Sequence, residues 1–141
     1  MRFILVPAFI LLSSMLADAQ SGPCTESAVQ RGNLAPADDA FSYMPPFGKP
    51  VVGKTAIQSA GAKSFSDRTN ITRAWVGEHR IVPTASGDMA YEYGTMRMGY
   101  DESGKHNEFE AVILSVYRAK DGVCQIAAST MQPLEEQPPT R

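Results

Sequence analysis

The chain has 141 residues, and its 13 lysines and arginines against 15 aspartates and glutamates give a net charge of −2 at pH 7. A chain of this length suits one domain with a modest core. Because no basic run appears and the charge is near neutral, the composition argues against nucleic acid as a partner.

Residues 1–19 have the three parts of a cleavable secretory signal peptide. Arg2 gives the positive start, residues 3–12 form an apolar stretch, and Ala17 and Ala19 supply the small residues before the cleavage site. The apolar stretch is shorter than the ~20 residues that cross a bilayer, and Pro7 interrupts it. We therefore expect a secreted or periplasmic protein without a stable membrane anchor.

The chain has two cysteines, Cys24 and Cys124. In an oxidising compartment they can form a disulfide that ties the N-terminal segment to the last strand. Two unpaired thiols are the alternative, because a sequence does not give the distance between them.

The predicted elements follow in chain order. Residues 27–30 allow a short helix that Gly32 ends, and residues 45–50 form a proline-rich turn. A helix is expected from Thr55 to about Phe65, with Thr55 and Gln58 at capping-box spacing. Strands are expected at residues 71–78, 80–85, 89–100, 106–119 and 123–131, and the Pro/Glu-rich residues 133–141 are predicted to be disordered.

The turns predict how these strands pair. Tyr100 is expected opposite His106, and Lys120 opposite Val123. In this register one face of the sheet is aromatic and apolar and carries Met89, Tyr91, Tyr93, Arg97, Phe109, Ala111, Ile113, Tyr117, Cys124, Ile126 and Ala128. The other face is mixed, with an apolar strip that suits a subunit contact, so a homodimer is expected.

Several segments resemble one family. They are Asp-Asp-Ala-Phe at 38–41 with Met-Pro-Pro at 44–46, and residues 48–57, 86–95, 116–122 and 126–128. Over about residues 38–131 the chain resembles the SnoaL-like, ketosteroid isomerase-like domains of the nuclear transport factor 2-like superfamily. The resemblance implies an α+β fold at residues 20–132, in which a curved antiparallel sheet wraps around a few helices to form a cone. Its pocket would hold a small apolar or amphipathic molecule, and the N-terminal helical part is short here.

The chain departs from the ketosteroid isomerases where their catalysis begins. Their carboxylate general base stands just before a proline, and the matching residue here is Met44, whose thioether cannot accept a proton. The first helix, which carries an oxyanion-stabilising tyrosine in the isomerases, is shortened or lost. Cys124 and Gln125 also stand where relatives usually have tryptophan and lysine. The resemblance therefore argues against isomerase activity, and no catalytic residue is assigned.

Five side chains on the expected inner face are the predicted ligand-pocket residues: Tyr91, Tyr93, Arg97, Phe109 and Tyr117. Phenols and a guanidinium can fix a ligand's oxygen or carboxylate inside an apolar pocket. Core packing is the alternative for the tyrosines, and a solvated rim position is the alternative for Arg97.

The two histidines, His79 and His106, show no metal-ligand spacing, so neither a metal site nor a cofactor is expected. His79 and Glu78 are neighbours on a strand and would point to opposite faces, which argues against an acid/base pair. Asp38 and Asp39 are interpreted as cap or turn residues.

The leading hypothesis is an exported SnoaL-like protein that binds a small hydrophobic or amphipathic molecule in its cone. One alternative is an isomerase, dehydratase or cyclase that acts on a carbonyl-bearing substrate with a base other than position 44. A second alternative is a structural or partner-binding module whose own side chains fill the cone.

Overall fold

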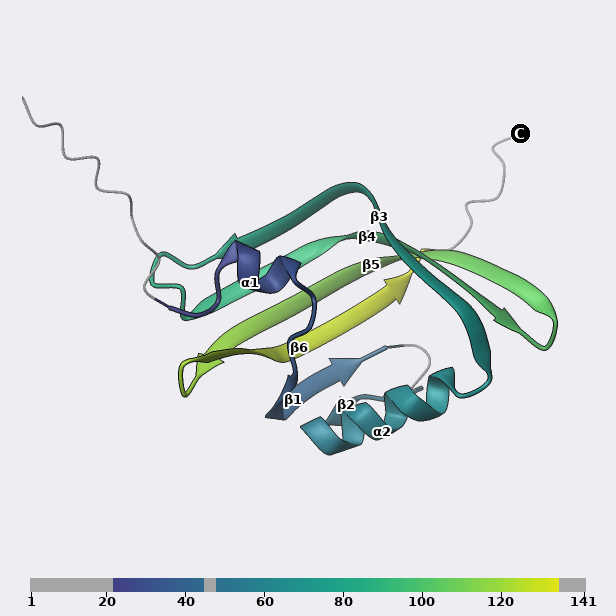
Figure 1. The fold of residues 1–141 in the computed structure, drawn as a ribbon, viewed down its shortest axis with the longest axis horizontal. Coiled ribbons are helices and arrows are strands. Elements are labelled where there is room, and N and C mark those ends of the chain that lie inside the picture. The colour runs from purple at the N-terminus through teal and green to yellow at the C-terminus, as the bar shows by residue number, and fades with distance from the viewer. Residues whose placement is uncertain (1–21, 45–47, 135–141) are drawn as a thin grey trace, which may run out of the picture.

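The computed structural model of the protein describes residues 22–44 and 48–134 (Figure 1). The expected signal peptide, part of the proline-rich turn and residues 135–141 of the predicted tail lie outside the described residues. Among the described residues, no helix has both the length and the apolar character needed to cross a membrane.

The sheet has six strands in the order β2-β1-β6-β5-β4-β3. Their bounds are β1 (Pro36–Tyr43), β2 (Val51–Val52), β3 (Arg68–Pro83), β4 (Met89–Glu102), β5 (Lys105–Lys120) and β6 (Val123–Pro133). The sheet is curved, and the expected α+β cone is confirmed (Figure 1). It is mixed, however, because β1 pairs with β6 in parallel while all other neighbours are antiparallel.

Two helices lie with the sheet: α1 (Glu26–Gln30) and α2 (Lys54–Phe65). The Thr25 side chain caps α1 by accepting a hydrogen bond from the Ala28 backbone N–H at 3.2 Å. The helix expected after residue 54 is confirmed, but its capping box is wrong, because Gly53 is the N-cap and makes no side-chain bond. Gly53 has φ 95°, which favours glycine, and its N–H donates to the Ala40 carbonyl at 2.8 Å. This backbone contact sets where α2 begins.

Two boundaries differ from the sequence prediction. The strands expected at 71–78 and 80–85 are one strand, β3, whose pairing with β4 is irregular between Val76 and His79. Pro133 and Leu134, which were expected to belong to a disordered tail, are ordered, because Pro133 ends β6 and the Leu134 N–H donates to the Glu110 carbonyl at 2.8 Å. Pairing with β5 orders these two residues, and composition does not reveal this pairing.

The β4–β5 register is one residue away from the prediction. Lys120 lies opposite Val123 as expected, but Tyr100 lies opposite Asn107 and not His106. Ser103 and Gly104 have φ 53° and 76°, so they make a tight two-residue turn in place of the longer loop that was expected. A slip of one residue moves every side chain of one strand to the other face. The even-numbered residues of β4 therefore share a face with Phe109 and Tyr117.

The core lies on the concave face, where α1 contributes the buried Val29. One buried cluster contains Cys24, Val29, Ala90, Tyr117 and Cys124, and a second contains Met98, Ala111 and Met131. Figure 1 shows α1 over one end of the sheet and α2 beside β1 and β2.

A disulfide joins Cys24 to Cys124, with a Cα–Cα distance of 5.0 Å and 100 residues of sequence separation. Both cysteines are buried. The Cys24 N–H also donates to the Gly87 carbonyl at 2.9 Å. The bond thus fixes the segment that carries α1 onto the start of β6.

We expect the paired substitution Cys24→Ser and Cys124→Ser to lower the free energy of unfolding by about 2–5 kcal/mol, because the disulfide closes a long loop of the unfolded chain. Urea unfolding of both proteins, with and without reductant, measures the change. Reductant should lower the stability of the natural chain alone. An equal effect of reductant on both proteins would contradict the prediction.

Candidate functional site

A cavity of about 220 Å³ lies on the concave face of the sheet. Most of its lining is apolar, and three polar side chains interrupt it. The lining residues are Met44, Phe65, Arg73, Trp75, Glu92, Met96, Met98, Ile113, Ser115 and Met131.

The strand register brings these side chains together. Every second residue of a strand points to the same face, so Glu92, Met96 and Met98 line the cavity from β4. Glu92 lies opposite Ser115 on β5, and Ile113 lies opposite Met131 on β6. Met44, the residue at the isomerase base position, also lines the cavity. The site is thus built mainly on strands. It has a methionine at the position where an isomerase would need a carboxylate base.

Two neighbours, His79 and Tyr117, hold the Glu92 side chain in place. We call these three residues the Glu92 cluster. The Tyr117 hydroxyl donates to Glu92 Oε2 at 2.5 Å, and His79 Nε2 lies 2.8 Å from Glu92 Oε1. The Glu92 side chain is 13% exposed and that of His79 is 24% exposed. The Trp75 ring stacks on the His79 ring at 3.9 Å between centroids. A carboxyl group is therefore fixed in position at the wall of an apolar cavity.

Burial raises the pKa of Tyr117, and the hydrogen bond to Glu92 raises that pKa further. Both effects favour the neutral phenol, since burial disfavours a charged phenolate and a nearby carboxylate repels one. Tyr117 consequently remains a hydrogen-bond donor to Glu92 across the physiological pH range.

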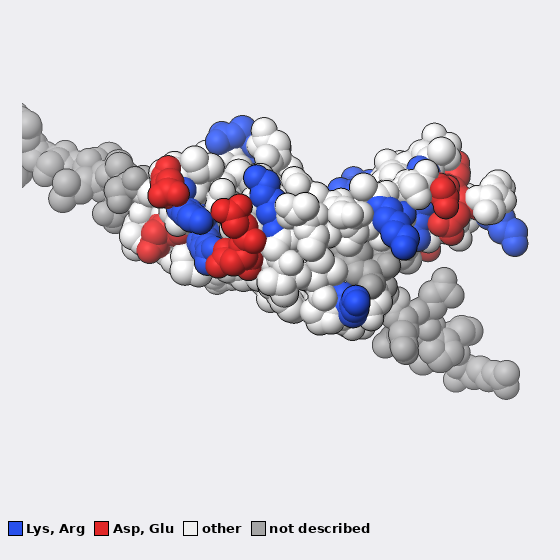
Figure 2. Space-filling view, turned by 90° about the horizontal axis from the view of Figure 1, so that it is seen from below, with Lys and Arg blue, Asp and Glu red and all other residues white. Residues whose placement is uncertain are grey.

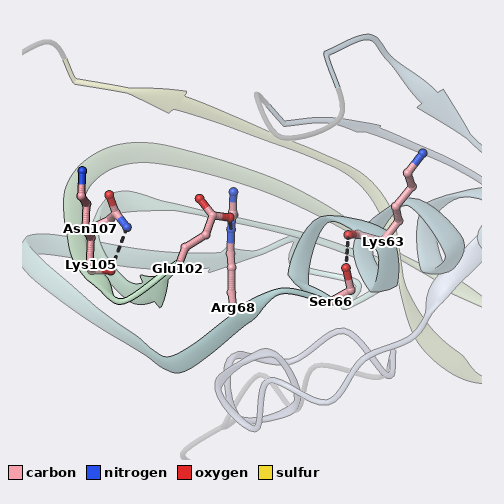
Figure 3. Close-up of polar contacts among 6 residues, drawn as sticks. All are labelled: Lys63, Ser66, Arg68, Glu102, Lys105 and Asn107. Carbon is pink, nitrogen blue, oxygen red and sulfur yellow. Dashed lines mark hydrogen bonds and ion pairs between the residues drawn. The ribbon is translucent and has the colours of Figure 1, made fainter.

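The rim of the cavity is formed where α2 ends. The Arg68 guanidinium lies 4.1 Å from the centre of the Tyr100 ring and 5.6 Å from that of Phe65. Its Nε is 3.1 Å from Glu102 Oε1, and the Ser66 hydroxyl donates to the Lys63 carbonyl at the end of α2 (Figure 3). Arg68 therefore connects the end of α2 to β4, and this connection positions Phe65 against the cavity.

The five predicted pocket residues lie on two different faces of the sheet. Phe109 and Tyr117 lie on the concave face, where Phe109 packs edge-on against Tyr100 and Tyr117 holds Glu92. Tyr91, Tyr93 and Arg97 lie on the opposite, outer face, because of the one-residue difference in register.

On the outer face, the Tyr91 and Tyr93 rings stack at 6.1 Å, and Arg97 pairs with Glu110 at 2.7 Å. Neither tyrosine nor Arg97 lines the cavity. The sequence reasoning missed Glu92 as a site residue, although it stands between these two tyrosines. Its signal was a charged residue in a strand face that otherwise carries Ala90, Met96 and Met98.

The remaining candidates have other partners. Glu78 pairs with Arg80, so the neighbour of His79 takes no part in the Glu92 cluster. Asp38 lies 3.6 Å from Lys120, and Asp39 accepts a hydrogen bond from Arg118, which lowers the pKa of that carboxyl.

Acidic and basic side chains also lie together on the face drawn in Figure 2. Figure 2 shows acidic and basic side chains next to one another near two ends of that view, with a mostly uncharged surface between them. Across residues 22–44 and 48–134, no group of three or more His, Cys, Asp and Glu side chains is arranged to hold a metal ion.

The sequence matches no protein-family model and no curated protein sequence. Solved structures do match its fold. A nuclear transport factor 2-like protein of Salmonella enterica has a TM-score of 0.61 at 10% identity and covers 75% of each chain. A ketosteroid isomerase-like protein of Erwinia carotovora has a TM-score of 0.59 at 18% identity, over 78% of this chain and 88% of its own. The chain has the nuclear transport factor 2-like fold.

A third structure with this fold comes from Xanthomonas campestris and is named for the association domain of calcium/calmodulin-dependent protein kinase II. Its TM-score is 0.62 at 16% identity, over 72% of this chain and 71% of its own. Because all three identities are low, the likeness establishes the nuclear transport factor 2-like fold and not a shared activity. The function of the cavity therefore depends on its own residues.

The raised pKa of Tyr117 predicts a loss of stability in alkali. A tyrosine of the unfolded chain ionises near pH 10, whereas folded Tyr117 keeps its proton to a higher pH. Above about pH 10 the unfolded state binds fewer protons than the folded state, so the free energy of unfolding falls as pH rises. Urea unfolding between pH 8 and 11 should show a smaller fall for Tyr117→Phe than for the natural chain. An equal fall in the two proteins would contradict this prediction. Tyr91→Phe, on the outer face, is the control and should show the same fall as the natural chain.

Proposed function

We propose that the mature protein is exported and binds a small hydrophobic or amphipathic molecule in the concave-face cavity. The observation that carries this proposal is the lining, in which apolar side chains surround a few fixed polar groups. Ligand sites commonly have this composition. The cavity, at about 220 Å³, is below the ~300–1,000 Å³ of most ligand pockets, which favours a small ligand.

The methionines allow the cavity to adapt to the shape of its ligand. Met44, Met96, Met98 and Met131 all line the cavity. Methionine has three rotatable bonds and a polarisable sulfur, so it adjusts to different apolar surfaces at little cost. A cavity built from such side chains favours binding through shape and apolar contact over one rigid substrate geometry.

The disulfide supports export. Buried disulfides persist in oxidising compartments such as the periplasm or the extracellular medium. This agrees with the signal peptide expected from residues 1–19, and the two arguments are independent because one rests on the leader and the other on the folded domain.

The outer face of the sheet supports a homodimer. One row of small and large apolar side chains crosses all six strands, from the edge strand β2 to the edge strand β3: Val52, Phe41, Ala128, Val116, Tyr91 and Val82. A parallel row contains Tyr43, Leu114 and Tyr93, which are about two-fifths exposed. An apolar surface that continues across a whole sheet is typical of an interaction site. A second copy of the chain is the proposed occupant, since like faces can meet in a two-fold dimer.

Enzymatic proton transfer on a carbonyl-bearing substrate is supported less well. It would require a base other than Met44, and Glu92 is the carboxylate that lines the cavity. However, Tyr117 and His79 each form a hydrogen bond with one of its oxygens, so only part of its acceptor capacity remains for a substrate proton. Binding is therefore the preferred function. A carbonyl-bearing compound that co-purifies with the protein and is converted by it would reverse this preference.

Native mass spectrometry of the purified mature protein should show a bound small molecule. Ile113→Phe adds bulk inside the cavity and should abolish this binding, because the larger ring takes the ligand's place. Val112→Phe adds similar bulk on the outer face and should retain the ligand. Equal ligand occupancy in both variants, or an empty natural protein that also binds no apolar probe, would contradict the proposal.

The dimer prediction is tested on the outer face. Leu114→Glu places a charge in the apolar row and should convert a dimer to a monomer, because burying an unpaired carboxylate is unfavourable. Light scattering after size-exclusion chromatography measures the mass. Val123→Glu, at the β5–β6 turn, is the matched control and should remain dimeric. A monomeric natural protein would refute the dimer.

A further inference from the structure

Two charged side chains line the cavity, Arg73 on β3 and Glu92 on β4. Arg73 lies opposite Met98, which is six residues beyond Glu92 on β4. At about 3.3 Å per residue, the two backbone positions are roughly 20 Å apart along the strand. The positive and negative groups therefore approach the cavity from opposite ends.

Arg73 differs from other arginines of the sheet in having no carboxylate partner. Arg68, Arg80, Arg97 and Arg118 each form an ion pair with an acidic side chain. Within the part of the chain that the structure describes, no carboxylate lies within ion-pair distance of Arg73. The Arg73 guanidinium lies over the Phe65 ring, 5.6 Å from its centre. An exposed guanidinium at the cavity is thus available to an anionic group.

Glu92 offers the complementary chemistry at the buried end. An ionised carboxylate can accept about four hydrogen bonds, and Tyr117 and His79 account for two of them. The positions that remain can accept from a hydroxyl or amine of a ligand. Between the two charged groups the lining is apolar, with Trp75 opposite Met96.

We propose that the cavity holds its ligand in one orientation, with an anionic group at Arg73, an apolar body along Trp75 and Met96, and a hydrogen-bond donor at Glu92. The ligand class is a monocarboxylate with a hydroxyl or amine at its far end. The reverse orientation would bring the ligand carboxylate to Glu92, where like charges repel. This inference rests on the proposed function, because it specifies the ligand of the same cavity.

Three matched probes test the orientation: 8-hydroxyoctanoate carries both groups, octanoate lacks the hydroxyl, and 1-octanol lacks the carboxylate. Isothermal titration calorimetry with the natural protein should give an affinity for 8-hydroxyoctanoate at least about tenfold higher than for either other probe, since each polar contact involves a charged group.

Two variants assign the groups. Arg73→Met keeps the apolar stem and should weaken 8-hydroxyoctanoate and octanoate about tenfold or more, with no effect on 1-octanol. Glu92→Gln keeps the shape and should weaken 8-hydroxyoctanoate and 1-octanol, with no effect on octanoate. Arg80→Met, on the same strand but paired with Glu78, is the control and should bind all three probes as the natural chain does. Circular dichroism of each variant checks that it is folded.

The outcomes separate the two proposals. Suppose that 1-octanol binds the natural protein, but that 8-hydroxyoctanoate binds no more tightly than 1-octanol or octanoate. The proposed orientation is then wrong, and the proposed binding of an apolar molecule in the cavity stands. The same conclusion follows if Arg73→Met weakens all three probes equally. If none of the three probes binds the natural protein, both the orientation and the proposed function are overturned.

Discussion

The tight turn at Ser103 and Gly104 holds β4 and β5 in one register, and both faces of the sheet depend on it. In this register Glu92 faces Ser115 and Tyr91 faces Val116. A shift of one residue would exchange the two sides of β4, putting tyrosines in the cavity and a carboxylate on the outer face. The separation of a cavity with one fixed carboxylate from an outer face rich in aromatic residues therefore has a local cause.

Glu92 also explains why the concave face is not simply a packed core. Burying a carboxyl group without partners is costly, so its neighbours must supply hydrogen bonds. Tyr117 and His79 do so, and Trp75 limits the movement of the His79 ring. These contacts hold the side chain in a place where apolar packing alone would favour a residue such as leucine. The stability of the domain and the proposed ligand recognition would thus depend on the same few side chains.

Much of the fold follows from the sequence, because strand-forming residues and glycine turns mark β4, β5 and β6 clearly. The helix at Lys54–Phe65 was predicted, although its start depends on the Gly53 backbone contact with Ala40, which lies outside the local pattern. The strand at Pro36–Tyr43 was missed because Asp38 and Asp39 look like turn residues, and their partners Lys120 and Arg118 come from a distant strand.

The site was harder to predict, since a one-residue ambiguity in the loop at residues 101–105 decided which side of β4 was assigned to the pocket. Phe109 and Tyr117, whose strand side was assigned correctly, do lie on the concave face. Glu92 and Arg73 could be recognised only after pairing placed them on that face.

The disulfide would have a consequence for the chain during export, if the protein is exported as proposed. Cys24 precedes a helix of five residues, which is too short to persist without tertiary contacts. Cys24, Cys124, Val29 and Tyr117 belong to one buried cluster, so the same covalent bond that fixes α1 also keeps water from the Tyr117 end of the Glu92 cluster. In a reducing cytoplasm that cover would be held by packing alone. The cover over the Tyr117 end of the Glu92 cluster would then be completed only after translocation, which would separate the place of synthesis from the place of the proposed binding.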